Sequence, residues 1–317
     1  MNIALTYNEK RSLDERDAEF DTREAIATVA QALGALGHTA VPIDVTGSIP
    51  ALVQRLAQAA PDLVLNFAEG ERGAFREAFY PALFDQLGLA TVGSAPSTLA
   101  LCLDKALAKR VVAASGVRVP PGGIATCVED VGELRYPLIV KPNCEGSSKG
   151  ITAASIVRAP DELPAVLAAA CASHPHGVLV EELVPGIDVS VGWIAALGLL
   201  PSIHYAYAGE VYDFALKHVT PERVSIITPA VLSPRTAADL ATAARRAFTA
   251  LGVAGYGRAD FRITPEGEVI FLEMNPLPSL TLVAGHDELY AAAAVLGKSP
   301  ADVLAAILVA APSPRPS

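Results

Sequence analysis

The chain has 317 residues, which is long enough for two or three domains. About half of its residues are apolar (51%) and 18% are charged, a composition that is typical of a folded globular protein and argues against disorder. The net charge of −10 disfavours nucleic acid as a partner, because an acidic chain repels phosphate backbones, yet a few local lysines and a metal ion can still hold a nucleotide.

The start of the chain and its apolar runs indicate where the protein resides. Residues 1–7 form a strand-like run with no basic leader region, so we expect no signal peptide. The longest apolar runs, at 189–203 and 303–312, are too short to span a membrane. The cysteines lack the spacing of a metal site, which favours reduced residues; they are Cys102, Cys127, Cys144 and Cys171. We expect a cytoplasmic protein with no membrane partner.

Strand and helix patterns alternate over the first part of the chain. Strand-like runs at 3–7, 39–45 and 63–67 are separated by helical patterns that begin after Asp21 and at residue 51. The order Asp21-Thr22-Arg23-Glu24 predicts a capping box with Asp21 as the cap, and Gly37 ends the apolar stripe of that helix. A βαβαβ order of this kind predicts a parallel sheet.

Paired strands replace this alternation later in the chain. A helix is predicted at about 101–115, and strands at 136–141 and 151–156 flank a loop. A hairpin of 188–195 and 200–207, a helix at 236–251, two strands around Pro265-Glu266-Gly267 and a helix near 300–309 follow, before a loose proline-rich end at 312–317. We therefore predict an α/β protein whose later part is α+β, divided into residues 1–98, 99–186 and 187–317.

The strongest local motif is a Gly/Ser loop that follows a strand ending in Lys141. The loop reads Pro142-Asn143-Cys144-Glu145-Gly146-Ser147-Ser148-Lys149-Gly150. Such a loop can turn backbone N–H groups and hydroxyls toward phosphate oxygens, and Lys141 adds a positive charge. It lacks the spacing of a P-loop. Taken alone, it is better explained as an ordinary hairpin loop with a solvated lysine.

A second motif combines Arg258-Ala259-Asp260 with Glu273-Met274-Asn275 on two predicted antiparallel strands. Strand alternation puts Glu273 and Asn275 on one side of their strand. Two carboxylates and an amide oxygen are ligands suited to Mg²⁺, and an arginine on the same face can neutralise a developing negative charge. A polar surface sheet would explain the same residues, but the apolar Phe271, Leu272 and Met274 argue against it.

Three weaker motifs complete the set. A strand runs into Glu181 and Glu182, Lys105 lies in a predicted helix after Asp104, and Lys217 lies in a predicted mobile loop. Each of these, by itself, is better explained as a polar strand end or a solvated lysine.

Taken together and in this order, the motifs resemble those of the D-alanine–D-alanine ligase branch of the ATP-grasp superfamily, from about Asn66 onward. The resemblance implies an ATP-grasp fold, in which an N-terminal parallel βαβ domain precedes two α+β subdomains that clamp ATP. It also implies ATP and two Mg²⁺ ions, or Mn²⁺ in their place, as cofactors, and small amino-acid-like substrates.

The resemblance assigns a role to each candidate residue. ATP is contacted by Lys105, Lys141, Glu145, Ser147, Ser148, Glu181, Glu182, Leu183, Val184, Asp188 and Lys217. The metal ions are held by Asp260, Glu273 and Asn275. Arg258, Ser147 and Lys217 are catalytic, and Arg258, Glu69 and Ser279 contact the substrates.

The departures from the family pattern fall mainly in the motifs with which the family binds its substrates. The family's early Glu-Arg-Glu-Val-Ser motif is absent, with Glu15 or Glu19 as candidate replacements for its first glutamate. Its His-Gly is Glu69-Gly70 here, its tyrosine after the loop lysine is His218, and residues 281–290 lack its Ser-x-x-Leu. A ligase with another substrate pair is therefore expected.

Three functions are considered. The first is an ATP-dependent carboxylate–amine ligase that forms an amide through an acyl phosphate and releases ADP and phosphate. The second is D-alanine–D-alanine ligase of cell-wall synthesis, against which the departures count. The third is a non-catalytic nucleotide-binding regulator or carrier, which the presence of all three metal-ligand candidates disfavours. A homodimer is expected by analogy with the family.

Overall fold

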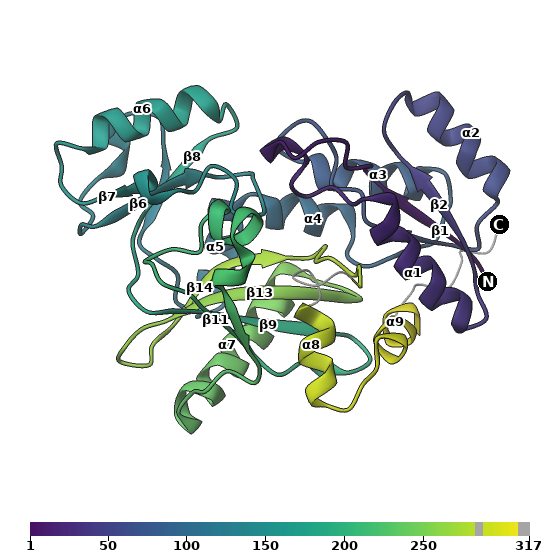
Figure 1. Ribbon diagram of the computed structural model, residues 1–317. Coiled ribbons are helices and arrows are strands. Elements are labelled where there is room, and N and C mark those ends of the chain that lie inside the picture. Colours follow the sequence, from purple (N-terminus) through teal and green to yellow (C-terminus); the bar gives the residue numbers. More distant parts are fainter. Residues whose placement is uncertain (283–287, 310–317) are drawn as a thin grey trace.

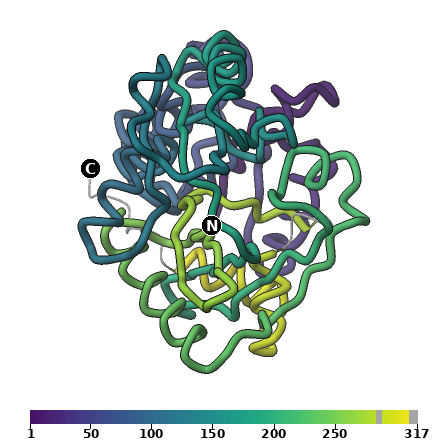
Figure 2. Tube along the Cα trace, turned by 90° about the vertical axis from the view of Figure 1, so that its left-hand side faces the viewer, coloured from purple at the N-terminus to yellow at the C-terminus, as the bar shows by residue number. Residues whose placement is uncertain are grey.

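Three β-sheets organise the protein, as a computed structural model that describes residues 1–282 and 288–309 shows (Figure 1). An N-terminal sheet has the order β2-β1-β3-β4, a central sheet β5-β8-β6-β7, and a C-terminal sheet β12-β11-β9-β13-β14 with β10 beside β9. In the view of Figure 2 the teal central segment lies above the green and yellow C-terminal segment. The proline-rich end at 312–317 and part of the 281–290 segment lie outside the described residues.

The N-terminal sheet is parallel, as the sequence predicts. Its strands are β1 (Asn2–Tyr7), β2 (Thr39–Asp44), β3 (Leu63–Asn66) and β4 (Thr91–Val92), and its helices are α1 (Arg23–Ala35), α2 (Ile49–Ala59) and α3 (Arg76–Gln86). The predicted cap at Asp21 is wrong. Thr22 caps α1 by accepting a hydrogen bond from the N–H of Ala25, while the carbonyl of Asp21 accepts one from the N–H of Lys10.

The helix predicted at 101–115 is confirmed for most of its length but is not continuous, because two helices occupy this region. They are α4 (Pro96–Leu103) and α5 (Lys105–Ala114), and Asp104 between them is extended. The Asp104 carboxylate accepts hydrogen bonds from the N–H of Leu107 at 2.9 Å and from the side-chain amide of Asn143 at 2.8 Å. The break places Lys105 at the first position of α5, where its side chain is buried.

The central sheet is antiparallel and consists of β5 (Gly122–Ala125), β6 (Leu138–Pro142), β7 (Ile156–Val157) and β8 (Val178–Glu182), with α6 (Leu163–Ser173) packed on it. The strand predicted at 151–156 is wrong for most of its length. A 3-10 turn, Ala153–Ser155, occupies it because Thr152 and Ser155 cap each other's backbone N–H groups.

The C-terminal sheet contains the predicted hairpin and the predicted strand pair. Its strands are β9 (Ile187–Ile194), β10 (Gly198–Leu199), β11 (Ile203–Ala206), β12 (Ser225–Ile227), β13 (Tyr256–Ile263) and β14 (Val269–Asn275). Its helices are α7 (Pro234–Leu251), α8 (Glu288–Val295), which the sequence did not predict, and α9 (Pro300–Val309). The segment of Lys217 is a short π-helix, Ala215–Val219, and not an irregular loop.

One apolar core joins the two ends of the chain. It contains Ile3 and Ile26 from the N-terminal part together with Ile203, Leu289 and Ile307 from the C-terminal part, all of them buried. The N-terminal sheet therefore packs against α8 and α9, next to β9 and β11. The domain boundaries near 98 and 186 stay a prediction.

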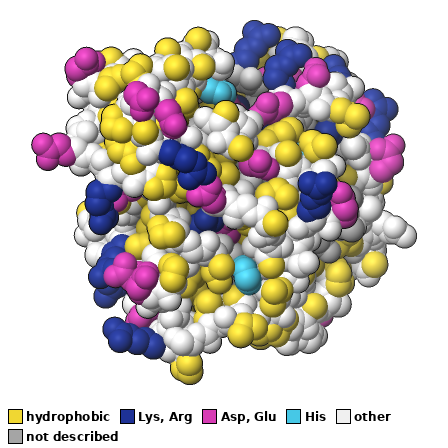
Figure 3. Space-filling view, turned by 60° about the vertical axis from the view of Figure 1, so that its left-hand side comes forward, with side chains coloured by type: hydrophobic (Ala, Val, Ile, Leu, Met, Phe, Trp, Pro, Cys, Tyr) yellow, Lys and Arg dark blue, Asp and Glu magenta, His cyan; other side chains and the backbone are white. Residues whose placement is uncertain are grey.

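The surface and the helices add two observations. Acidic and basic side chains are interspersed with apolar ones on the face drawn in Figure 3. Among the described residues, no single helix is long and apolar enough to cross a membrane; α8 and α9 meet that test only as a pair, and they are bent by 102° where they join.

Asp104 is the residue that fixes the α4–α5 break. Replacing it by Ala removes the cap and one partner of Asn143, so we expect the Asp104→Ala variant to lose about 1–2 kcal/mol of unfolding free energy in urea titrations. Asp161→Ala, at an exposed turn, is the matched control and should change the value by less than about 0.5 kcal/mol. A loss no greater than that of the control would show that the cap is not what sets the break.

Candidate active site

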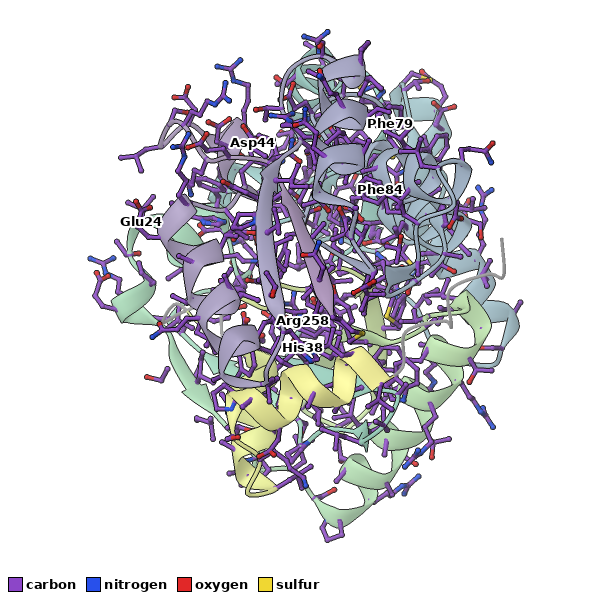
Figure 4. The ribbon with its side chains drawn as sticks, turned by 90° about the vertical axis from the view of Figure 1, so that its right-hand side faces the viewer. Glu24, His38, Asp44, Phe79, Phe84 and Arg258 are labelled. Carbon is purple, nitrogen blue, oxygen red and sulfur yellow. The ribbon has the colours of Figure 1, made fainter. Side chains whose placement is uncertain are left out.

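Two cavities meet where the three sheets come together. The N-terminal cavity lies between the N-terminal part of the chain and the end of β14, and the inter-sheet cavity lies between the central and C-terminal sheets. They share the side chains of Lys105, Lys217, Arg258, Glu273 and Glu288. Figure 4 marks Arg258 near the centre of the molecule.

The structure brings together every residue to which the family resemblance assigns a role. The N-terminal cavity is lined by Glu69, Glu145, Ser147, Asn275 and Ser279, and the inter-sheet cavity by Lys141, Ser148, Glu181, Glu182, Leu183, Val184, Asp188 and Asp260, in addition to the shared residues. Their location is thus established, whereas the role of each one stays a prediction.

The inter-sheet cavity has apolar walls and a polar end. Ile139, Val189 and Leu272 lie along its walls. At its end the Glu182 carboxylate pairs with Arg135 at 2.8 Å, and Asp188 pairs with Arg262 at 2.6 Å and accepts a hydrogen bond from Tyr207. Such a mixture suits a flat heterocycle with a polar sugar attached.

A buried ion triad, Lys109–Glu181–Lys141, adjoins the inter-sheet cavity, which Glu181 and Lys141 line. Lys141 lies 2.9 Å from Glu181, and Lys109 pairs with the other oxygen of the same carboxylate. Burial lowers the pKa of Lys109 to about 7 although Glu181 opposes the shift. One carboxylate cannot fully compensate two buried ammonium groups, so the triad has an excess of positive charge. Motif reasoning missed Lys109; its position one helical turn after Lys105 was the available signal.

The candidate metal ligands lie on the β13–β14 pair. Asp260 is opposite Glu273, and Arg258 is opposite Asn275. The strands slip here: Asp260 pairs with Glu273 but Phe261 with Phe271, so Leu272 is an extra, bulged residue. Because of the bulge, Phe271 packs in the core against Phe261 while Glu273 and Asn275 face the cavities.

Basic side chains of the protein already pair with both of these carboxylates. Arg258 donates two hydrogen bonds to Asp260, at 2.8 and 2.9 Å, and Lys105 lies 3.3 Å from Glu273. Burial acts to raise the pKa of Glu273, but neighbouring charges, first of all Lys105, lower it to about 2. Among the described residues no group of three or more His, Cys, Asp or Glu is arranged for a metal ion. The donor set of two charged carboxylates and an amide oxygen nevertheless fits Mg²⁺ in type and register.

The Gly/Ser loop is held in an unusual backbone conformation. Ser147 and Ser148 have φ of 53° and 57°, a left-handed conformation that costs a non-glycine residue roughly 1–2 kcal/mol. The Ser147 carbonyl lies 3.1 Å from Nε2 of His218, and the Ser148 hydroxyl donates to the carbonyl of Tyr212 at 2.9 Å. The loop and the π-helical segment are therefore joined through His218.

Charged groups of the N-terminal part hold the same loop from the other side. Glu19 pairs with Arg76 at 2.8 Å and with Lys149, and Arg76 donates to the carbonyl of Cys144 at 2.7 Å. Burial would raise the pKa of Glu19, but the two cations lower it to about 2. Glu15 accepts a hydrogen bond from the N–H of Gly150 at 2.6 Å and does not line either cavity. Motif reasoning missed Arg76.

Comparison with known proteins supplies independent information. Residues 123–308 match the family model described as D-ala D-ala ligase C-terminus. The chain is 33% identical over 262 residues to a D-alanine–D-alanine ligase of Geobacter sulfurreducens, covering 81% of this chain and 79% of that protein. It is 32% identical over 275 residues to the enzyme of the same name from Gloeobacter violaceus, covering 84% and 87%.

Solved structures confirm the predicted fold. The D-alanine–D-alanine ligase of Bacillus anthracis complexed with ATP superposes with a TM-score of 0.75 at 21% identity, over 98% of this chain and 97% of that one. The VanG D-Ala:D-Ser ligase of Enterococcus faecalis superposes with a TM-score of 0.74 at 22% identity, over 97% and 98%.

The charge balance of the triad gives a stability prediction. Glu181→Gln leaves two buried ammonium groups facing each other and should cost about 3–5 kcal/mol of unfolding free energy. Lys109→Met leaves a balanced Lys141–Glu181 pair and should cost less than half as much. Urea titration of both variants measures the difference, and an equal or larger loss in Lys109→Met would contradict the proposed charge excess.

Proposed function

This chain belongs to the D-alanine–D-alanine ligase family and is an ATP-dependent carbon–nitrogen ligase, and from that premise we propose that it joins two small amino-acid-like molecules other than two D-alanines. A carboxylate oxygen of the first substrate bonds to the γ-phosphorus of ATP as the bond to ADP breaks. The amine of the second substrate then bonds to the acyl carbon as phosphate leaves, with loss of a proton. The observation that carries this proposal is the junction of the two cavities at Lys105, Lys217, Arg258 and Glu273.

The inter-sheet cavity is proposed as the ATP site. Glu181, Glu182 and the backbone of Leu183 and Val184 lie where the adenine would be read, and Asp188 lies where the ribose would be held. Lys105, Lys141 and the loop with Glu145, Ser147 and Ser148 would bind the phosphates. Asp260, Glu273 and Asn275 would hold Mg²⁺, which supplies charge neutralisation of the phosphoryl group.

The junction is proposed as the place of reaction. Arg258 and Lys217 reach both cavities, so they are positioned to neutralise the transferring phosphoryl group and the oxyanion of the tetrahedral intermediate. Burial, then the charge of Arg258, lowers the pKa of Lys217. Ser147 would order the loop over the phosphates, and the backbone near Ser279 would donate to the oxyanion.

Synthesis of D-alanyl-D-alanine is the second candidate, favoured by the names of the relatives. The substrate-binding motifs argue for the first, because Glu69 stands where the family has histidine and lines the N-terminal cavity. One structural relative is named as a D-Ala:D-Ser ligase, so a change of partner is compatible with this fold. A cytoplasmic location and a homodimer belong to the same proposal.

The reaction is tested by an ADP-release assay on pairs of amino acids, with product masses recorded. We expect ADP and phosphate only when both an acceptable carboxylate and an acceptable amine are present, and little turnover with D-alanine alone. Clear turnover with D-alanine alone would favour the second candidate, and release of AMP and pyrophosphate would reject the acyl-phosphate route.

Removal of the Arg258 guanidinium tests its charge-neutralising role. With the pair found by that assay, Arg258→Ala should reduce kcat/KM by about 10²–10³-fold, the loss typical of a transition-state donor. Arg235→Ala, whose side chain is 93% exposed, is the control and should leave kcat/KM unchanged. A loss below about threefold in Arg258→Ala would remove Arg258 from the reacting centre.

Chelation tests the metal. We expect EDTA to abolish ADP release and added Mg²⁺ or Mn²⁺ to restore it, because a divalent cation, which Asp260, Glu273 and Asn275 would hold, would neutralise the charge of the phosphoryl oxygens. Glu273→Gln should raise the Mg²⁺ concentration for half-maximal rate at least tenfold. An unchanged Mg²⁺ dependence in that variant would exclude Glu273 as a ligand.

A further inference from the structure

The wall of the N-terminal cavity carries three carboxylates without partners. Asp21, Glu69 and Glu77 all line this cavity. Within residues 1–282 and 288–309, none of their side chains makes a hydrogen bond or an ion pair. An uncompensated carboxylate away from water is unfavourable, so this arrangement calls for a positive charge from elsewhere.

Glu77 is the most deeply placed of the three. It lies in the first turn of α3 and is only 7% exposed, yet its side chain borders the cavity. Its neighbour Arg76 is committed elsewhere, to Glu19 and to the carbonyl of Cys144. Burial raises the pKa of Glu77 to about 7, and burial followed by the charge of Glu77 raises the pKa of Glu69 well above its usual range. Among the described residues no cation pairs directly with either acid, although Arg76 and Lys149 oppose both pKa shifts from a longer distance.

Glu19 differs from these acids in its partners. It also lines the cavity, but Arg76 and Lys149 both pair with its carboxylate. A methyl group at Gly146 would overlap its Oε1 atom, so Glu19 is packed against the Gly/Ser loop. Glu19 is therefore an ion that fastens the loop to the N-terminal part, and two cations already pair with its Oε2 atom.

The unpaired acids and the basic residues line different parts of the cavity. Glu69 and Glu77 line this cavity alone, whereas Lys105, Lys217 and Arg258, together with Glu273 and Glu288, line its junction with the inter-sheet cavity. A molecule with a carboxylate at one end and a cationic nitrogen at the other is attracted in one orientation, with its carboxylate toward the site of phosphoryl transfer.

We propose that Glu77, together with Glu69, binds a cationic nitrogen of the carboxyl-donating substrate and so determines which carboxylic acids this ligase accepts. The ligand class is a carboxylic acid that carries an ammonium or guanidinium group. That the bound molecule is the carboxyl donor rests on the proposed function; the cation site itself does not.

Calorimetry with two matched pairs tests the cation site without turnover. The full-length protein, loaded with Mg²⁺ and a non-hydrolysable ATP analogue, is titrated with alanine against propionate and with ornithine against norvaline. We expect the cationic member of at least one pair to bind at least tenfold more tightly. The first pair isolates an α-ammonium and the second a side-chain ammonium. Equal binding in both pairs, or no binding of either cationic member, overturns the proposal.

Variants separate recognition from structure. Glu77→Gln should reduce the calorimetric preference for the cationic ligand to below threefold. In the ADP-release assay the same variant should raise the KM of the carboxyl donor at least tenfold and leave the KM of ATP unchanged. Glu71→Gln, at an exposed position of the same segment, should keep both values. If Glu77→Gln keeps the preference for the cationic ligand, the proposal is overturned. If the wild-type protein shows this preference but turns over no pair of substrates, only the proposed function is rejected.

Thermal unfolding excludes a merely structural role. Because Glu77 lacks a partner, Glu77→Gln should melt at or above the wild-type temperature, whereas Glu19→Gln, which leaves Arg76 and Lys149 unpaired, should melt at a lower one. If Glu77→Gln melts as low as Glu19→Gln, Glu77 is part of the structural ion network and the proposal fails. Glu69→Gln provides a second route to the binding test if Glu77→Gln is not soluble.

Discussion

The antiparallel pairing of β13 with β14 is the constraint on which the site depends. It sets Asp260 opposite Glu273 and Arg258 opposite Asn275, so that four candidate side chains belong to two pairs of one ladder, with the Ala259–Met274 pair between them. The bulge at Leu272 then turns Glu273 and Asn275 toward the cavities while Phe271 remains in the core. If the regular pairing of Phe261 with Phe271 continued by one more residue, Leu272 and not Glu273 would lie opposite Asp260.

Basic and acidic side chains lie in different places around this strand pair. Lys105, Lys141, Lys217 and Arg258 surround the acidic pair at the junction, and burial strengthens these interactions because water is excluded. Two acids without direct partners, Glu69 and Glu77, line only the N-terminal cavity. The Gly/Ser loop lies between the two regions and is tied to both, through His218 and Tyr212 on one side and through Glu15, Glu19 and Arg76 on the other. The two cavities are therefore bordered by one loop.

The sequence predicted features that depend on residues close together in the chain and missed contacts between residues far apart in it. Alternation along one strand was sufficient to place Glu273 beside Asn275, and the ordered motifs were sufficient to name the family. Three features depend on residues distant in the chain: Lys109 meets Glu181 over 72 positions, Arg76 meets the Cys144 carbonyl over 68, and the α4–α5 break is held by Asn143, 39 residues after Asp104. No periodicity or spacing contains such pairings. The unpaired acids of the N-terminal cavity, Glu69 and Glu77, were the least predictable. They can be recognised only because they have no direct partner among the described residues of the folded chain.

Isotope transfer is the most direct test of the central claim that a carboxylate is activated as an acyl phosphate at the junction. The carboxyl donor is labelled with ¹⁸O at both carboxylate oxygens, and the inorganic phosphate released during amide formation is analysed by mass spectrometry. Attack of the carboxylate on the γ-phosphorus predicts one ¹⁸O atom in each phosphate and one in the amide product. Unlabelled phosphate, or ¹⁸O recovered in AMP, would contradict the account.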